Sequence, residues 1–333
     1  MLAVCPTTPE TLAAGPPRLV ELPDPIPGPG EVVLAVRATA LNRADLLQLR
    51  GHYPPPPGES EIPGLECAGV VEAVGSGVES LREGDRVMAL LAGGGHATRV
   101  VVPSGQTMPI PDGLGFADAA ALPEVALTAW TNLVHEGGLE AGETVLIVAA
   151  ASGVGTFAVQ LARELGARVV VAGRSRARLE ALRPLGADLC LELGGGSAED
   201  AAGFVERLRA DVPGGVELVI DLAGGEPLGP RLGALATRGR YVLVGVLAGS
   251  RATLDLRDVL SRRLRLIGSV LRARSREEKA RLVEGFHAFA AERLRDGRLR
   301  PVVDRTLPFE QILDAYEQMR AGGHLGKIVL TMD

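Results

Sequence analysis

The sequence predicts an α/β protein with a doubly wound parallel sheet beside a smaller β-rich domain. The first observation is an apolar, strand-like run at residues 144–148 that passes through small residues into a helical pattern. The second is that further strand-like runs alternate with helical patterns, which indicates a parallel sheet covered by helices; these runs are 168–172, 216–221 and 240–246. The third is a Pro- and Gly-rich segment up to about residue 125, in which turns separate short strand-like runs.

The segment 144–162 (TVLIVAAASGVGTFAVQLA) predicts a dinucleotide-binding turn. Small residues let backbone N–H groups approach a pyrophosphate, and the positive end of the helix dipole favours its charge. Against the pattern G-x-G-x-x-G, Ala150 and Ser152 replace the first two glycines and only Gly155 matches the third. An ordinary tight strand–helix turn is the alternative interpretation. We expect the cofactor phosphates to lie on Ala151, Ser152, Gly153, Val154 and Gly155.

The end of the next strand-like run favours NADP(H) over NAD(H). An NAD-binding fold places an acid there for the ribose 2′-hydroxyl. This chain has no acid in the stretch and instead carries Arg174, Ser175, Arg176 and Arg178. Guanidinium groups suit a 2′-phosphate, with Arg174, Ser175 and Arg178 as the expected contacts. The alternative is that these arginines only solvate a helix start.

Length and composition exclude several classes of function. A chain of 333 residues suggests two domains, and a net charge of −6 gives no support for nucleic-acid binding. Three cysteines without C-x-x-C spacing indicate a reducing compartment. Neither a signal peptide nor an apolar run of about 20 residues is evident, so we expect a cytoplasmic protein without a membrane span.

Other patterns complete the expected organisation. The β-rich segment contains strand-like runs at 31–38, 69–74, 86–91 and 98–102. A last strand-like run, 326–330, is a candidate to rejoin this first domain. Helical patterns are expected at 43–49, 117–135, 276–295 and 309–320.

An ordered series of motifs resembles the medium-chain dehydrogenase/reductase superfamily. The series is more similar to the zinc-free quinone oxidoreductases of the zeta-crystallin type, and most similar to the branch of the tumour-suppressor-induced quinone oxidoreductase. The motifs span the chain: ALNRADLLQLRGHYPPPPG (40–58), PGLECAGVV (63–71), MALLAGGG (88–95), AAALPEVALTAW (119–130), AAASGVGT (149–156), DLAGG (221–225) and GHLGKIVL (323–330).

The resemblance implies a domain organisation and an assembly. It implies a GroES-like catalytic domain built from residues 1–125 and 266–333. A Rossmann NADP(H)-binding domain at residues 126–265 is inserted into it, and the active site lies in the cleft between the two. It also implies a homodimer formed through the nucleotide-binding domains, with an apolar edge strand at 264–270 pairing with its twin across a two-fold axis.

Zinc is not expected. Zinc-dependent relatives place a Cys where this chain has Asn42, and a Gly-His-Glu where it has Gly64-Leu65-Glu66. Leu65 cannot bind a metal, and the five histidines are scattered. Without a Lewis acid, the accessible reaction is hydride delivery to an acceptor that is already electrophilic. A quinone or an activated enone fits this description.

The resemblance places two candidate catalytic residues in the first domain. The Asn42 amide could donate to a quinone oxygen, or Asn42 could instead cap the helix at 43–49. Tyr53 precedes four prolines in a stiff loop, and its phenol is a candidate donor to the acceptor. Asp45 is expected to order this loop, and Glu66 to be a structural carboxylate.

The remaining cofactor contacts are also implied by the resemblance. They are Thr128, Gly245, Val246, Leu247, Ser269, Leu271 and Lys327. Simple helix packing is the alternative role for Thr128.

The leading interpretation is an NADPH-dependent quinone or enone reductase whose partner is a small molecule. A reductase of enoyl thioesters is the alternative within enzymes. The rival class is a non-catalytic NADPH-binding protein with a structural or RNA-associated role, against which the acidic balance argues.

Overall fold

The computed structural model describes residues 1–13 and 15–332, which form two compact units. We call residues 1–127 and 271–333 the terminal domain, and residues 128–270 the central domain. The sequence placed the corresponding boundaries after residues 125 and 265. The central domain is a continuous piece of chain, whereas the terminal domain is assembled from both ends of the sequence.

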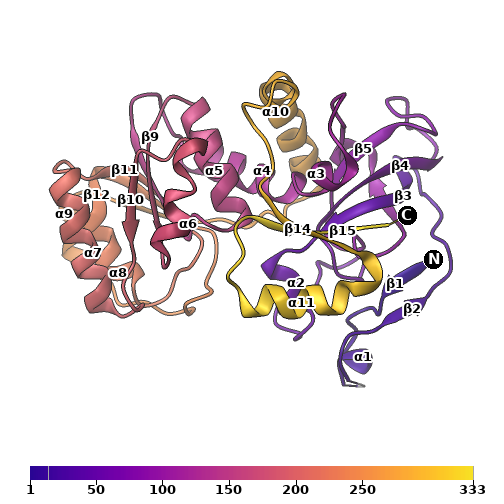
Figure 1. The fold of residues 1–333 in the computed structure, drawn as a ribbon, viewed down its shortest axis with the longest axis horizontal. Coiled ribbons are helices and arrows are strands. Elements are labelled where there is room, and N and C mark those ends of the chain that lie inside the picture. The colour runs from indigo at the N-terminus through magenta and orange to yellow at the C-terminus, as the bar shows by residue number, and fades with distance from the viewer. Residues whose placement is uncertain (14, 333) are drawn as a thin grey trace. The chain divides into compact units, whose positions relative to one another are not determined.

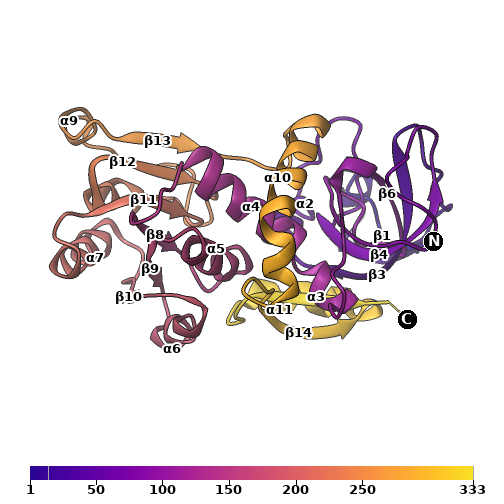
Figure 2. The ribbon, with the colours of Figure 1, turned by 90° about the horizontal axis from the view of Figure 1, so that it is seen from above.

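The central domain holds a six-stranded parallel sheet in the order β10-β9-β8-β11-β12-β13, which Figure 2 shows from one edge to the other. The chain starts in the middle and winds outward in both directions, so the doubly wound prediction is confirmed. Figure 2 also shows α5 and α7 on opposite faces of the sheet. The strands are β8 (Thr144–Val148), β9 (Arg168–Gly173), β10 (Leu189–Glu192), β11 (Val216–Asp221), β12 (Leu235–Leu243) and β13 (Arg265–Gly268).

The helices of this domain cover an apolar sheet. Every residue of β8 is buried, as a strand between helical layers requires. The helices are α5 (Gly153–Glu164), α6 (Arg176–Glu180), α7 (Ala198–Asp211), α8 (Leu228–Arg231) and α9 (Leu256–Ser261). Short helical turns are η2 (Thr131–Glu136), η3 (Arg183–Leu185) and η4 (Leu232–Ala234).

A buried carboxylate closes the carboxyl end of β11. Asp221 accepts hydrogen bonds from the backbone N–H groups of Ala223 and Gly224, from the Arg231 guanidinium and from the Tyr241 hydroxyl. Burial raises the pKa of Tyr241, and the Asp221 charge adds to the rise. These four donors offset the cost of burying the Asp221 charge.

The terminal domain is built on a mostly antiparallel sheet in the order β14-β15-β3-β4-β5-β7, with β6 also paired to β3. Figure 1 labels β14, β15, β3, β4 and β5 of this sheet. β15 lies between β14 and β3, so the expectation that the last strand rejoins the first domain is confirmed. The strands are β3 (Glu31–Ala40), β4 (Glu66–Val74), β5 (Arg86–Leu90), β6 (Arg99–Pro103), β7 (Thr107–Pro109), β14 (Val303–Pro308) and β15 (Lys327–Thr331), with a separate pair β1 (Leu2–Val4) and β2 (Leu19–Glu21).

Most predicted helices are present, and one is divided. The helix predicted at 276–295 is α10 (Arg276–Arg295), which begins with a capping box of Ser275 and Glu278. The helix predicted at 117–135 is wrong in extent, because the chain instead forms α3 (Phe116–Ala120), α4 (Pro123–Trp130) and the turn η2. The helical elements not yet given are α1 (Pro9–Ala13), α2 (Arg43–Gln48), η1 (Ser104–Gln106), η5 (Phe309–Gln311) and α11 (Ile312–Ala321).

The strand predicted at 240–246 also needs correction, because β12 starts at Leu235 and ends at Leu243. In its last pairings Leu243 lies opposite Asp221 and Gly268, the final residues of β11 and β13. Beyond that point β11 turns away, so the residues after Leu243 have no further strand to pair with.

We predict that Gly155→Ala lowers the free energy of unfolding by about 1–3 kcal/mol, the usual cost of overpacking. A Cβ on Gly155 would lie 2.5 Å from the Cα and the carbonyl oxygen of Ala150, so backbone would have to move. Urea denaturation measures the loss. The matched control is Gly214→Ala, where an added Cβ meets no atom within 4 Å. Equal stabilities for the two variants would contradict the close approach of helix and strand.

We further predict that the chain is a homodimer. β13 is an edge strand of the central sheet, and its Leu266 side chain is 46% exposed. Pairing of two such edges would satisfy their open backbone groups. Light scattering at micromolar concentration should give twice the chain mass of 34.7 kDa. A single-chain mass would count against this assembly.

Candidate functional site

The turn after β8 has the geometry of a phosphate-binding loop. Ala149 has a φ of 61°, a conformation that is uncommon for residues other than glycine. Ser152 caps α5 by accepting a hydrogen bond from the Gly155 N–H at 3.1 Å. Gly155 lies against the Ala150 backbone, which is the helix–strand packing role of the third glycine in the dinucleotide pattern. The remaining turn residues, Ala151, Gly153 and Val154, are half-buried.

The arginines after β9 differ in what they contact. Arg174 is exposed and makes no hydrogen bond or ion pair with another described residue, and Ser175 is the N-cap of α6. Arg176 donates to the Cys190 carbonyl at 3.0 Å and pairs with Glu180 at 2.6 Å. Arg178 is half-buried. Arg174 is therefore the arginine of this group most available to a bound phosphate.

The other predicted cofactor residues fall in both domains. Gly245, Val246 and Leu247 follow β12, and the Val246 and Leu247 side chains are 50% and 56% exposed. The Ser269 N–H donates to the Leu243 carbonyl, and the Thr128 carbonyl accepts from the Asn132 amide. Leu271 and Lys327 belong to the terminal domain. Their contacts with a cofactor remain predictions.

A buried polar cluster in the terminal domain is organised around the Glu66 carboxylate. Glu66 Oε1 accepts from Lys327 Nζ at 2.6 Å and from Asn42 Nδ2 at 2.9 Å. Glu66 Oε2 accepts from the Glu124 backbone N–H at 2.9 Å. Lys327 Nζ also donates to the Leu41 carbonyl at 2.6 Å and to Asn42 Oδ1 at 2.7 Å. All three ammonium protons of Lys327 thus have acceptors inside the terminal domain.

Asn42 serves both the helix start and the cluster. It is the N-cap of α2, and its backbone N–H donates to Asp45 Oδ2 at 2.6 Å. Asn42 thus occupies the N-cap position, but its side chain makes no capping hydrogen bond and is engaged instead by Glu66 and Lys327. Asp45 Oδ1 accepts from the Gly64 N–H, so Asp45 joins the start of α2 to the segment before β4; its ordering of the Tyr53 loop stays a prediction. Donation from Asn42 to a substrate stays a prediction.

Behind this cluster, His96 is fully buried. Its Nδ1 lies 2.6 Å from the Tyr316 hydroxyl, and its Nε2 lies 3.8 Å from Asp45 Oδ2. Burial lowers the pKa of His96. A neutral imidazole between Tyr316 and Asp45 fits a structural role.

Glu124, at the start of α4, is the unexpected member of the cluster. The residue as a whole is half-buried, but its Oε2 is inaccessible to solvent and has no hydrogen-bond partner among the described residues. Burial, and then the nearby Glu66 charge, raise the pKa of Glu124 to about 8. Glu124 is therefore a carboxyl group that keeps its proton at neutral pH.

The chain contains only two lysines, and both are buried in the terminal domain. Lys327 is 3% exposed and Lys279, in α10, is 2% exposed. Lysine is almost never fully buried without a partner. Lys327 has its partners, but the Lys279 amine donates no hydrogen bond to another described residue. Burial lowers the pKa of Lys279, against the opposing effects of Glu59 and Glu124.

Arg272 holds the loop that carries Tyr53. Its guanidinium donates to the Tyr53 carbonyl at 3.0 Å, to the Ala92 carbonyl at 2.7 Å and to Gln48 Oε1 at 2.6 Å. The same guanidinium lies 5.1 Å from the centre of the Tyr53 ring. Burial raises the pKa of Tyr53, and Glu124 adds to the rise. The phenol is therefore held in place in its protonated, donating form.

The residues of this cluster do not fit a zinc ion. Leu65, at the position where zinc-dependent relatives carry a ligand, is an apolar side chain buried in the core. Asn42 is committed to Glu66 and Lys327. Across residues 1–13 and 15–332, no three His, Cys, Asp or Glu side chains are grouped so that they could hold a metal.

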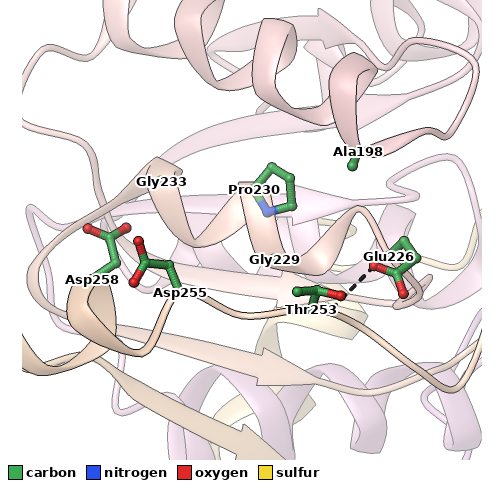
Figure 3. Close-up of a pocket in the computed structure, with 8 residues that line it drawn as sticks. All are labelled: Ala198, Glu226, Gly229, Pro230, Gly233, Thr253, Asp255 and Asp258. Atoms are coloured by element: carbon green, nitrogen blue, oxygen red, sulfur yellow. Dashed lines mark hydrogen bonds between the residues drawn. The ribbon is translucent and has the colours of Figure 1, made fainter.

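A separate hollow of about 390 Å³ lies in the central domain (Figure 3). Its three carboxylates already have local partners. Glu226 accepts from the Thr253 N–H, Asp255 caps α9, and Asp258 pairs with Arg262. The hollow therefore offers no uncommitted chemical group and is not the candidate site.

Two protein-family models match the chain. One, described as a zinc-binding dehydrogenase, matches residues 153–286, and the other, described as an alcohol dehydrogenase GroES-like domain, matches residues 28–112. Together with the parallel sheet of the central domain, they confirm the predicted fold class. In the part of the chain that the structure describes, no helix is both long and apolar enough to cross a membrane.

Known proteins resemble the chain over nearly its whole length. The human synaptic vesicle membrane protein VAT-1 homolog is 33% identical over 321 residues, which cover 92% of this chain and 80% of that protein. Among solved structures, a quinone oxidoreductase from Thermus thermophilus, also solved with NADPH, is 37% identical with a TM-score of 0.80, covering 96% and 97% of the two chains. The CurK enoyl reductase is 25% identical with a TM-score of 0.82, covering 100% and 99%.

The structure brings together some of the predicted site residues and adds others. Asn42, Glu66 and Lys327 are in direct contact, although Lys327 was predicted to bind cofactor. Glu124, Lys279 and Arg272 were not predicted. A signal for Glu124 existed, because it is the only charged residue in the apolar motif AAALPEVALTAW.

We predict that Glu124→Gln makes stability less dependent on pH. The folded protein keeps the Glu124 proton up to about pH 8, whereas the unfolded chain loses it near its ordinary value of 4.5. The unfolded state then binds fewer protons between these values, so the free energy of unfolding falls as pH rises through this range. Glutamine does not titrate and removes that contribution.

Urea denaturation at pH 5, 6.5 and 8 should show the Gln variant gaining stability relative to the unmodified protein as pH rises. The matched control is the exposed Glu79→Gln, which should show no such trend. A constant difference across the three pH values would mean that Glu124 is not protonated in the folded state.

Proposed function

We propose that this chain, which belongs to the medium-chain dehydrogenase/reductase superfamily, is an NADPH-dependent reductase of quinones or activated enones that works without zinc. Within the superfamily, we assign it to the zeta-crystallin-type quinone oxidoreductases and to their tumour-suppressor-induced branch. We also propose a cytoplasmic location and no nucleic-acid or membrane partner.

The observation that carries the cofactor assignment is the pair of loops that end β8 and β9. In the first loop, Ser152 caps α5 and Gly155 lies against the Ala150 backbone. In the second loop, Arg174 is exposed and has no hydrogen bond or ion pair with another described residue. The start of the 12-residue helix α5 favours a pyrophosphate, and Arg174 favours a 2′-phosphate. Bound NADPH would supply the hydride.

The terminal domain supplies groups that suit an electrophilic acceptor. Tyr53 is fixed by Arg272 and retains its proton, so it is available to donate a hydrogen bond to a carbonyl oxygen. A quinone or an enone spreads incoming charge over its conjugated oxygen, so hydrogen bonding and alignment are sufficient catalysis. Two similar proteins agree with this reaction class, namely the Thermus thermophilus quinone oxidoreductase and the CurK enoyl reductase.

A screen of NADPH oxidation against quinones, enones, aldehydes and enoyl thioesters tests the proposal. We expect turnover with quinones or enones that exhaustive chelation leaves unchanged. Exclusive turnover of enoyl thioesters would instead select the second candidate, which the likeness to the CurK enoyl reductase favours. Salt-sensitive RNA binding without any NADPH oxidation would select a non-catalytic role.

We predict that Arg174→Ala weakens NADPH binding by about ten- to a hundredfold, the equivalent of roughly 1.5–3 kcal/mol for one charge-assisted contact. NADH binding should be unchanged, because NADH lacks the 2′-phosphate. Fluorescence titration gives both dissociation constants. The matched control is Arg176→Ala, because Arg176 is already bound to Cys190 and Glu180. Equal affinity of the unmodified protein for both cofactors would refute the assignment.

We predict that Tyr53→Phe lowers kcat by about tenfold, equivalent to about 1.4 kcal/mol, without changing NADPH affinity. The variant removes one hydroxyl and keeps the ring that contacts Arg272. Steady-state kinetics with several quinones measures the effect. His52→Ala, an exposed neighbour in the same loop, is the control and should keep full turnover. Full turnover by Tyr53→Phe would show that the phenol is not catalytic.

A further inference from the structure

Three carboxyl groups lie in the polar cluster of the terminal domain, and only one of them lacks donors. Glu66 accepts from Lys327, Asn42 and the Glu124 backbone. Asp45 accepts from the backbone N–H groups of Asn42 and Gly64. Glu124 Oε2 is inaccessible to solvent and accepts from no described residue. A buried carboxylate without donors is strongly disfavoured, so the proton of this cluster belongs on Glu124.

Glu124 also differs from the other two acids in accessibility. Glu66 and Asp45 are completely buried, whereas Glu124 retains exposed surface. Its neighbours are the members of the site already described. Its N–H is bonded to the carboxylate that holds Asn42, and its charge acts on the Tyr53 phenol. Of the three carboxyl groups, Glu124 is the one placed to exchange a proton with a ligand bound beside Tyr53.

We infer that Glu124 is the proton donor of the reduction. The inference rests on the proposed function and assigns the protonation step that follows hydride transfer. A conjugated carbonyl acceptor gains a hydride from NADPH at one carbon, which leaves a negative charge on the conjugated system. The Glu124 O–H bond breaks and its proton neutralises that charge, at the α-carbon of an enone or the oxygen of a quinone. Solvent then returns a proton to the Glu124 carboxylate, so overall the acceptor, NADPH and one proton give the reduced acceptor and NADP⁺.

Charged groups on the surrounding elements raise or lower the proton affinity of Glu124. Glu66 in β4 and Asp45 in α2 hold the proton on Glu124, whereas Lys327 in β15 and Lys279 in α10 stabilise the carboxylate that remains after transfer. Tyr53 and Arg272 face the same region. Lys279 contributes directly, because its amine has no fixed acceptor and its positive charge favours the carboxylate that forms when Glu124 ionises.

The test compares Glu124→Gln with the unmodified protein. Glutamine keeps the size of the side chain and cannot release a proton. With an enone, kcat should fall at least about a hundredfold, the low end of what a general acid contributes. A quinone should lose less, because the hydroquinone anion stabilises its own charge. In the unmodified protein kcat should fall as pH rises above about 8, and this alkaline limb should be absent from the variant. NADPH affinity should be unchanged.

Glu59→Gln is the matched control, because Glu59 also acts on Lys279 but has no place in the proton transfer. Glu124→Asp should restore part of the enone turnover together with an alkaline limb. A kcat and pH profile in Glu124→Gln like those of the unmodified protein would overturn the inference.

Infrared spectroscopy separates this inference from the proposed function. The unmodified protein at pH 7, without cofactor, should show the carbonyl stretch of a protonated carboxylic acid, and Glu124→Gln should lack it. Persistence of that band in the variant would overturn the inference whatever the kinetics. If the band behaves as expected but no acceptor supports NADPH oxidation by the unmodified protein, the proposed function is rejected and the donor role falls with it.

Discussion

The interior of the terminal domain depends on the burial of one negative charge, the Glu66 carboxylate. A carboxylate removed from water needs donors, and those of Glu66 come from segments that are far apart in the sequence. Asn42 precedes α2, the Glu124 N–H starts α4, and Lys327 begins β15. Each of these segments is therefore fixed in place by the same two oxygen atoms. These donors are committed to Glu66, and the Glu124 Oε2 atom has no hydrogen-bond partner among the described residues.

The central domain uses a similar arrangement for a different purpose. Asp221 is completely buried at the end of β11, and its donors include two backbone N–H groups of the following turn. The Asp221 carboxylate thus shapes a loop, whereas the Glu66 carboxylate joins separate elements. Both carboxylates lie at the limit of a strand, Asp221 as the last residue of β11 and Glu66 as the first of β4, where backbone polar groups need partners outside the sheet.

Local patterns predicted much of the fold. β11 and α10 match their predicted ranges, because a buried strand and an amphipathic helix each repeat a pattern over several residues. The helix predicted at 117–135 is divided before Pro123, the first residue of α4, because proline has no N–H with which to continue the preceding helix. The parallel order of the central sheet followed from alternating strands and helices, and the strand that closes the terminal sheet was foreseen.

The chemistry of the site was harder to predict from sequence. Asn42 and Lys327 are 285 positions apart, and no local pattern reports that they touch. The resemblance predicts a cofactor contact for Lys327 and gives no sign that its ammonium protons have acceptors in its own domain. Glu124 was missed because its importance depends on burial and on the neighbouring Glu66 charge, both of which arise only after folding. The phosphate-binding turn was found because all of its parts are consecutive in the chain.

The position of Lys327 sets an order of events during synthesis. The central domain is one continuous stretch, so it has all of its strands once residue 270 has left the ribosome. At that stage Glu66 lacks its ammonium partner, and β3 lacks its neighbour β15. The first 127 residues must therefore wait, with a charge and a strand edge uncovered, until residues 327–331 are made. Throughout that interval the nascent chain has all the strands of its nucleotide-binding domain, but its terminal sheet has an unpaired edge. Such an edge can aggregate or bind chaperones.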